Sequence, residues 1–189
     1  MIKKRSFIFF ILITLFSLHS QCKLVDFKSE TVTQKVRFNI EFEFVAAENP
    51  LYQIKHISFD EVYKITGINP ATIQNAFIND IQVQVIGDNA AADTLTGAVS
   101  FKIMTPIIPP DTLLKFQNII LSPASNVVFS LSSENSPLAI DYVGLEKLKS
   151  LLTRTEPPVI VFFFEGAVES PPVNIQISIK VGVQIELKS

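Results

Sequence analysis

Residues 173–187 read VNIQISIKVGVQIEL. The odd-numbered positions of this stretch are all Val, Ile or Leu, whereas the even-numbered positions are polar residues or Gly. A period of two puts successive side chains on opposite faces of a strand, so the stretch predicts one long strand with a buried face and a wet face. Gly182 is where we expect a bulge or bend in this strand.

The same period appears near the start of the chain. Val36, Phe38, Ile40, Phe42 and Phe44 alternate with charged and polar residues, which predicts a second half-buried strand. We expect the strand at 173–187 either to pair with residues 36–45 or to offer its edge to a protein partner.

Shorter apolar runs between these two strands predict further strands. They cover residues 52–65, 78–86, 95–103, 114–121, 127–131 and 159–168. Residues 159–164, VIVFFF, are apolar on both faces, so we expect a central strand that is covered on two sides. All 11 prolines fall at or beyond the ends of the runs, and this supports the boundaries because proline cannot donate to a ladder.

One segment, residues 140–153, has a helical period. Its leucines at 145, 148, 151 and 152 share one face, Asp141 is a candidate N-cap, and Arg154 suits the negative end of the helix dipole. The fold class predicted is therefore all-β with one short helix: a single antiparallel or mixed β-sandwich of about seven to nine strands. The alternative is a small outer-membrane β-barrel, against which the 3 Tyr and 0 Trp argue because such barrels need aromatic girdles.

A targeting signal precedes the predicted sandwich. Lys3, Lys4 and Arg5 are followed by an uncharged, apolar run over residues 6–18, which is typical of a secretory signal peptide and is too short to span a bilayer. The alternative is a retained N-terminal membrane anchor. We expect residues 1–21 to be the signal peptide, 22–35 a tether or a first strand, and 36–189 the sandwich domain.

The single cysteine of the chain, Cys22, directly follows this segment in Leu18-His19-Ser20-Gln21-Cys22. The arrangement resembles a bacterial lipobox, in which the cysteine thiol receives a diacylglyceryl group and becomes the new N-terminus. It departs from the family pattern, because Leu18 lies four residues before the cysteine and Gln21, which is not small, adjoins it. Taken whole, the chain resembles small uncharacterised bacterial lipoproteins. That resemblance implies palmitate-type acylation at Cys22 and a place at a membrane, and the competing interpretation is cleavage after Ser20 with a free Cys22.

Composition excludes several classes of function. One Cys rules out an intramolecular disulfide framework and a Cys-rich zinc site, and we predict no metal site and no cofactor. Removing residues 1–21 leaves 13 basic and 18 acidic residues, a formal net charge of -5, so we expect no binding to nucleic acid.

The candidates for catalysis are weak. His56 lies near Asp60 and Glu61, but these two carboxylates would point to opposite faces of a strand, and no nucleophile motif accompanies the histidine. The loop at residues 87–93 carries Asp and Asn side chains without the ligand spacing of an EF-hand, which favours a plain hairpin loop. We therefore predict no catalytic and no cofactor-binding residues.

The phenylalanines leave a second function open. They could line a cavity for an apolar ligand or simply fill the core. We expect an exported protein of the bacterial cell envelope, lipid-anchored at Cys22, that acts as a non-enzymatic binding or structural module. The alternatives are a carrier of a lipid or other apolar ligand within the sandwich and, third, a small outer-membrane barrel or an enzyme. For location, the alternative is a secreted or periplasmic soluble protein.

Overall fold

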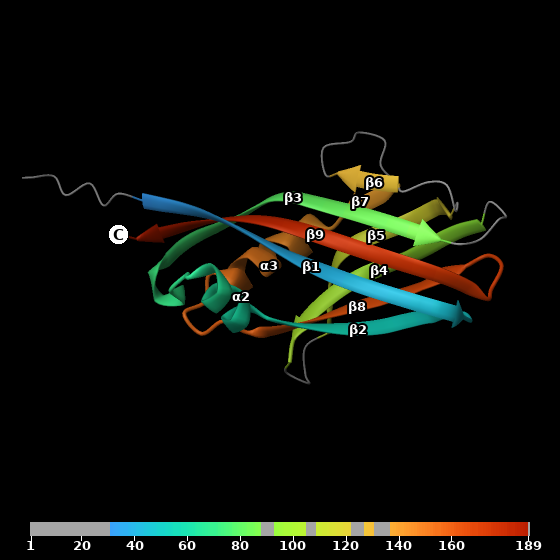
Figure 1. Ribbon diagram of the computed structural model, residues 1–189, viewed down its shortest axis with the longest axis horizontal. Helices are drawn as coiled ribbons and strands as arrows, with labels where there is room; N and C mark the ends of the chain where they lie inside the picture. The colour runs from blue at the N-terminus through green and yellow to red at the C-terminus, as the bar shows by residue number, and fades with distance from the viewer. Residues whose placement is uncertain (1–30, 88–92, 105–108, 122–126, 131–136, 189) are drawn as a thin grey trace, which may run out of the picture. The chain divides into compact units, whose positions relative to one another are not determined.

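The computed structural model describes residues 31–87, 93–104, 109–121, 127–130 and 137–188 (Figure 1). The elements are β1 (Thr31–Ala47), β2 (Leu51–Ser58), α2 (Phe59–Thr66), a 3-10 turn η1 (Pro70–Thr72), β3 (Ile73–Gly87), β4 (Asp93–Ile103), β5 (Asp111–Leu121), β6 (Val127–Ser130), β7 (Leu138–Ile140), α3 (Tyr142–Leu152), β8 (Val159–Val168) and β9 (Val173–Lys188). The prediction of an all-β fold is confirmed.

The strands form two antiparallel sheets. The four-stranded sheet has the order β1-β9-β3-β6, and the five-stranded sheet has the order β2-β8-β4-β5-β7. Their inward side chains share one hydrophobic core, so the domain is a β-sandwich. Because β1 begins at Thr31, residues 31–35, which the sequence left open as tether or strand, are part of the first strand.

The strand β9 holds the four-stranded sheet together. It pairs with β1 on one side and with β3 on the other, and its odd-numbered residues from Val173 to Ile185 are buried. The expected pairing with residues 36–45 is therefore present. The alternative, that this strand offers a free edge to a partner, is wrong, because both sides of β9 are hydrogen-bonded to neighbouring strands. The edge strands of this sheet are β1 and β6.

The irregularity expected at Gly182 lies on the neighbouring strand. Ile78 pairs with Val183 and Asp80 pairs with Gly182, so Asn79 is the extra residue of a bulge in β3. The register of β9 with β1 runs through Gly182 without interruption.

The segment predicted as one strand at 52–65 is a strand followed by a helix. Ser58 caps α2 by accepting a hydrogen bond from the Glu61 N–H at 3.4 Å, and Gly67 ends the helix with φ 71°. Phe59 and Tyr63, four residues apart, share the buried face. The described residues thus contain two short helices, where the sequence predicted one.

The predicted helix is α3. Asp141 accepts hydrogen bonds from the N–H groups of Val143 and Gly144, both at 3.1 Å, which confirms it as the N-cap. The four leucines of the predicted apolar face are buried. A Cβ at Gly144 would lie 1.8 Å from the Thr112 carbonyl oxygen, so only glycine lets α3 pack this closely on β5.

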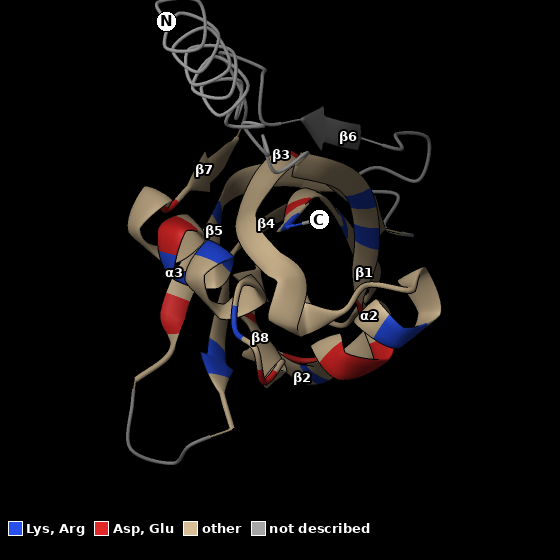
Figure 2. Ribbon diagram, turned by 90° about the vertical axis from the view of Figure 1, so that its left-hand side faces the viewer, with Lys and Arg blue, Asp and Glu red and all other residues tan. Residues whose placement is uncertain are grey.

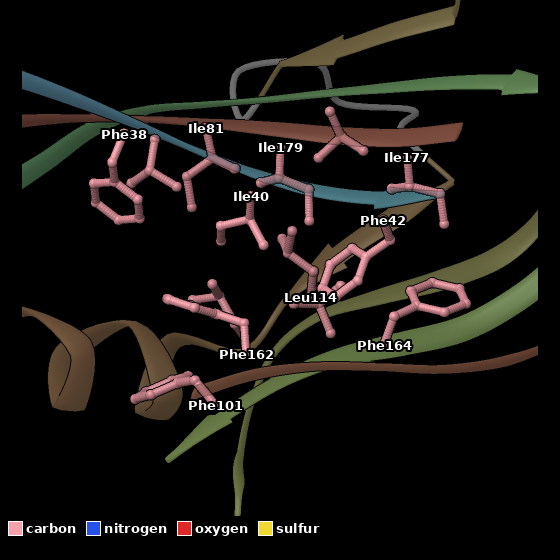
Figure 3. Close-up of a cluster of buried hydrophobic side chains, with 14 of the residues drawn as sticks. Phe38, Ile40, Phe42, Ile81, Phe101, Leu114, Phe162, Phe164, Ile177 and Ile179 are labelled. Carbon is pink, nitrogen blue, oxygen red and sulfur yellow. The ribbon is translucent and has the colours of Figure 1, made fainter. Parts of the chain in front are cut away.

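Phenylalanines fill the space between the sheets. Figure 3 shows Phe42 of β1 and Phe164 of β8 pointing toward each other, with ring centroids 5.7 Å apart. Phe42, Phe162, Phe164, Ile177 and Ile179 have 0% of their surface exposed. These side chains belong to the hydrophobic core that both sheets share.

Candidate interaction surface

The two outer faces of the sandwich differ in character. On the four-stranded sheet, the outward positions of β1 and β9 carry mainly charged and amide side chains, among them Lys35, Arg37, Asn39, Gln176 and Lys180. Two apolar side chains of β3, Phe77 and Ile86, lie on the same face and are 40% and 38% exposed.

The outer face of the five-stranded sheet carries neighbouring apolar side chains on paired strands, and the strand registers show how this surface is built. Ile54 lies opposite Phe163, which lies opposite Ser100, so these three side chains form one row across β2, β8 and β4. Two flanking rows complete the surface, which we call the aromatic face. They are Tyr52-Glu165-Ala98 and His56-Val161-Lys102.

Exposure marks the aromatic face as unusual. Tyr52 is 56% exposed and Ile54 is 40% exposed, and Phe163 between its neighbours is half-buried. Val161 is 4% exposed although it is not part of the core cluster. Clustered apolar side chains on an outer sheet face indicate a contact surface, whereas single exposed ones need no explanation.

A hollow of about 250 Å³ lies on the aromatic face. Tyr52, Phe163, Lys102, Glu165 and the small residues Ala98 and Ser100 line it together with Pro110. The Lys102 ammonium lies 5.2 Å from the centre of the Phe163 ring, a cation–π contact that holds the lysine stem over the sheet. The hollow therefore combines apolar groups with one cation, one anion and the two hydroxyls of Tyr52 and Ser100.

His56 belongs to this face, and its predicted acidic neighbours do not. Its exposed side chain lies opposite Val161. Asp60 and Glu61 lie in the first turn of α2, where Asp60 pairs with Lys64 at 2.5 Å. Figure 2 shows acidic and basic residues together on α2. The prediction that they point to opposite faces of a strand is wrong, because both lie on a helix, and the described structure gives neither a hydrogen bond to His56.

The candidate calcium loop is described only at its ends. Residues 88–92 lie outside the described residues, whereas Asp93 is buried and its two carboxylate oxygens accept from the Ser170 N–H at 3.2 Å each. Asp93 therefore holds the end of β8 to the start of β4. Among the described residues, no group of three His, Cys, Asp or Glu side chains is placed to hold a metal ion.

Cys22 and the predicted signal peptide lie outside the described residues. Among the helices that the structure does describe, none has the length and apolar character needed to cross a bilayer.

No protein-family model and no curated protein sequence matches this chain. Among solved structures, it is similar to turnip yellow mosaic virus, with 13% identity, a TM-score of 0.32, and coverage of 84% of this chain and 95% of that chain. Desmodium yellow mottle tymovirus gives 11% identity, a TM-score of 0.33, and coverage of 84% and 83%. The BFDV capsid protein gives 10% identity, a TM-score of 0.32, and coverage of 82% and 98%. Likeness at this level carries no information about what this chain does.

The sequence predicts only part of the aromatic face. The run VIVFFF correctly predicts a central strand, since β8 lies between β2 and β4. The expectation that both sides are covered is wrong for the outer side, where Phe163 stays half-buried beside the exposed Tyr52 and Ile54. A sequence pattern that indicates this exposed side is the pair of apolar residues Tyr52 and Ile54 at alternate positions of β2.

Proposed function

We propose that this chain is an exported protein of the bacterial cell envelope, lipid-anchored at Cys22, and that it acts as a non-enzymatic binding module through the aromatic face. The anchoring part rests on the sequence alone: a basic segment, a short apolar run and one cysteine directly after it. Several acyl chains on one residue hold a protein stably at a membrane surface.

The binding part rests on a single observation, namely that Tyr52, Ile54 and Phe163 form an apolar cluster on an outer face of the sandwich. A carrier needs a cavity of about 300 Å³ or more between the sheets. Here core side chains from the two sheets, such as Phe162 and Ile179, are each 0% exposed. The carrier alternative therefore has no support in the described core.

The chemistry of the aromatic face favours binding over catalysis. Catalysis requires a base within hydrogen-bond reach of a nucleophile or of the substrate proton. In the described residues, His56 has an apolar residue, Val161, directly opposite it, and Glu165 lies two rows away, opposite Tyr52. Tyr52 and Phe163 supply what a contact surface needs: large, stiff rings that bury apolar area at low entropic cost.

Site-specific photo-cross-linking in cells tests the binding face. The full chain is expressed in a bacterial host with a photoreactive phenylalanine analogue in place of Tyr52, and a matched variant carries the same analogue in place of Lys180 on the outer face of the other sheet. We expect a cross-linked adduct of defined mass from position 52 and none from position 180. Equal labelling from the two positions, or none from position 52, would contradict the proposal.

A further inference from the structure

The edge of β1 carries an incomplete pairing pattern. Strand β1 is hydrogen-bonded to β9 along one side only. Near its C-terminal end the other side is covered by a side chain: the Glu43 N–H donates to Oε1 of Gln53 at 2.8 Å, and Nε2 of Gln53 donates to the Glu43 carbonyl at 3.2 Å. The amide of Gln53 thus takes the place of a strand at that single residue.

These two hydrogen bonds show which way the backbone N–H and C=O groups of β1 point along the whole edge. Glu43 points its N–H and C=O away from β9, and the register between the two strands is continuous from Thr31 to Phe44. In an antiparallel pair, alternate residues direct their backbone groups to the partner and away from it. Arg37, Asn39 and Glu41 therefore also present their N–H and C=O groups at the edge, and no strand of the described residues pairs with them there.

The side chains on the same residues form a charge sequence that complements itself when reversed. In order they are Lys35, Arg37, Asn39, Glu41 and Glu43, and all five are exposed. Two basic residues precede the central Asn39 and two acidic residues follow it at the same spacing. An antiparallel copy of this edge therefore places opposite charges against one another.

We infer that the β1 edge pairs with the β1 edge of a second copy of this chain, antiparallel and with Asn39 opposite Asn39. Arg37 then lies opposite Glu41 of the second copy, and Lys35 lies opposite Glu43 of the second copy, each pair formed twice by symmetry. Two four-stranded sheets become one continuous sheet across a two-fold axis. The partner is identified by this charge order together with the unpaired backbone groups.

Other registers fit less well, which gives the inference its specificity. A shift that places Arg37 opposite Glu43 leaves Asn39 opposite Glu41 and removes Lys35 from any acidic partner. A parallel pairing in register places like charges beside each other, which disfavours it. The side-chain amide of Gln53 is already hydrogen-bonded to the N–H and C=O of Glu43. We therefore expect backbone hydrogen bonds between the two copies over residues 37–41, and side-chain pairing alone at Lys35 and Glu43.

Charge reversal and rescue test the pairing. The full chain is extracted from host membranes in a mild detergent, and its subunit number is measured by native mass spectrometry over a range of concentrations. We expect the wild-type chain to be a dimer and Arg37→Glu, which places Glu opposite Glu41, to weaken the dimer at least tenfold. The double variant Arg37→Glu/Glu41→Arg should restore dimerisation, and Lys115→Glu, with the same charge change on the other sheet, should leave it unchanged.

Two results overturn the inference: a wild-type chain that stays monomeric throughout, or a double variant that remains as weak as Arg37→Glu. Disulfide trapping gives a second measurement that does not depend on charge. Directly opposite residues in a hydrogen-bonded antiparallel pair have Cα atoms about 5.5 Å apart, within reach of a disulfide. Asn39→Cys should therefore form a covalent dimer on oxidation, whereas Lys115→Cys should not. Equal trapping of both variants also contradicts the inference.

Discussion

Two glycines face each other across β4 and β8, and they make room for one ring. Gly97 pairs with Gly166. The ring of Phe164 lies over them and packs against Phe44 and Phe116 with centroids 5.5 and 5.6 Å away. A Cβ on Gly166 would lie 2.5 Å from the Thr96 carbonyl oxygen and 2.9 Å from the Phe164 ring, so no side chain fits without moving the backbone or the ring.

Gly166→Ala should therefore destabilise the domain by about 1–3 kcal/mol, the usual range for overpacking a core. Gly182→Ala is the matched control, because a Cβ there meets its nearest atom at 3.4 Å, an ordinary contact. Urea denaturation followed by circular dichroism measures both. A Gly166→Ala variant as stable as Gly182→Ala would show that Phe164 is not held as described.

At the scale of elements, the two helices differ in how far the sequence predicts them. The leucines of α3 repeat at helical spacing over two turns, and Asp141 precedes them as a cap, so pattern and cap agree. Helix α2 has eight residues, and its buried residues Phe59 and Tyr63 continue directly from the alternating β2. An apolar run this short fits both the strand period and the helix period. The capping residues Ser58 and Gly67 are therefore the better sequence evidence for a helix here.

The two helices are joined by one buried hydrogen bond. The Tyr63 hydroxyl of α2 donates to the Leu152 carbonyl at the end of α3 at 2.6 Å. Burial raises the pKa of Tyr63 above its ordinary value of 10.0. Above about pH 10 an unfolded tyrosine therefore loses its proton while the folded one retains it, so this residue's contribution to stability is present below about pH 10 and declines as the pH rises further.

Tyr63→Phe should cost about 1 kcal/mol at neutral pH, because the Leu152 carbonyl loses its partner. The difference from wild type should be constant up to about pH 10 and shrink as the pH rises to about 11, since the variant has no hydroxyl to titrate. Tyr142→Phe serves as the control because that side chain is 74% exposed. Urea midpoints measured across this range provide the test, and a difference that does not change with pH would exclude the mechanism.

At the scale of the whole molecule, periodicity predicts the strands and their buried faces but not which strands become neighbours. The alternation in residues 173–187 correctly assigns the inward residues of β9, because burial follows local pattern. Its place between β1 and β3 depends on pairing with distant segments, which no local pattern encodes. The aromatic face was not predicted for the same reason. Ile54, Phe163 and Ser100 become neighbours only because β2, β8 and β4 pair.

The whole molecule is proposed to work at a membrane, and that claim depends on one residue, Cys22. Intact mass spectrometry of the membrane fraction from cells expressing the wild-type chain or Cys22→Ala tests it most directly. We predict a wild-type mass that begins at Cys22 and carries acyl groups, whereas Cys22→Ala lacks them and leaves the membrane fraction or keeps its signal. A wild-type chain without acyl mass that partitions as a soluble protein would contradict the account.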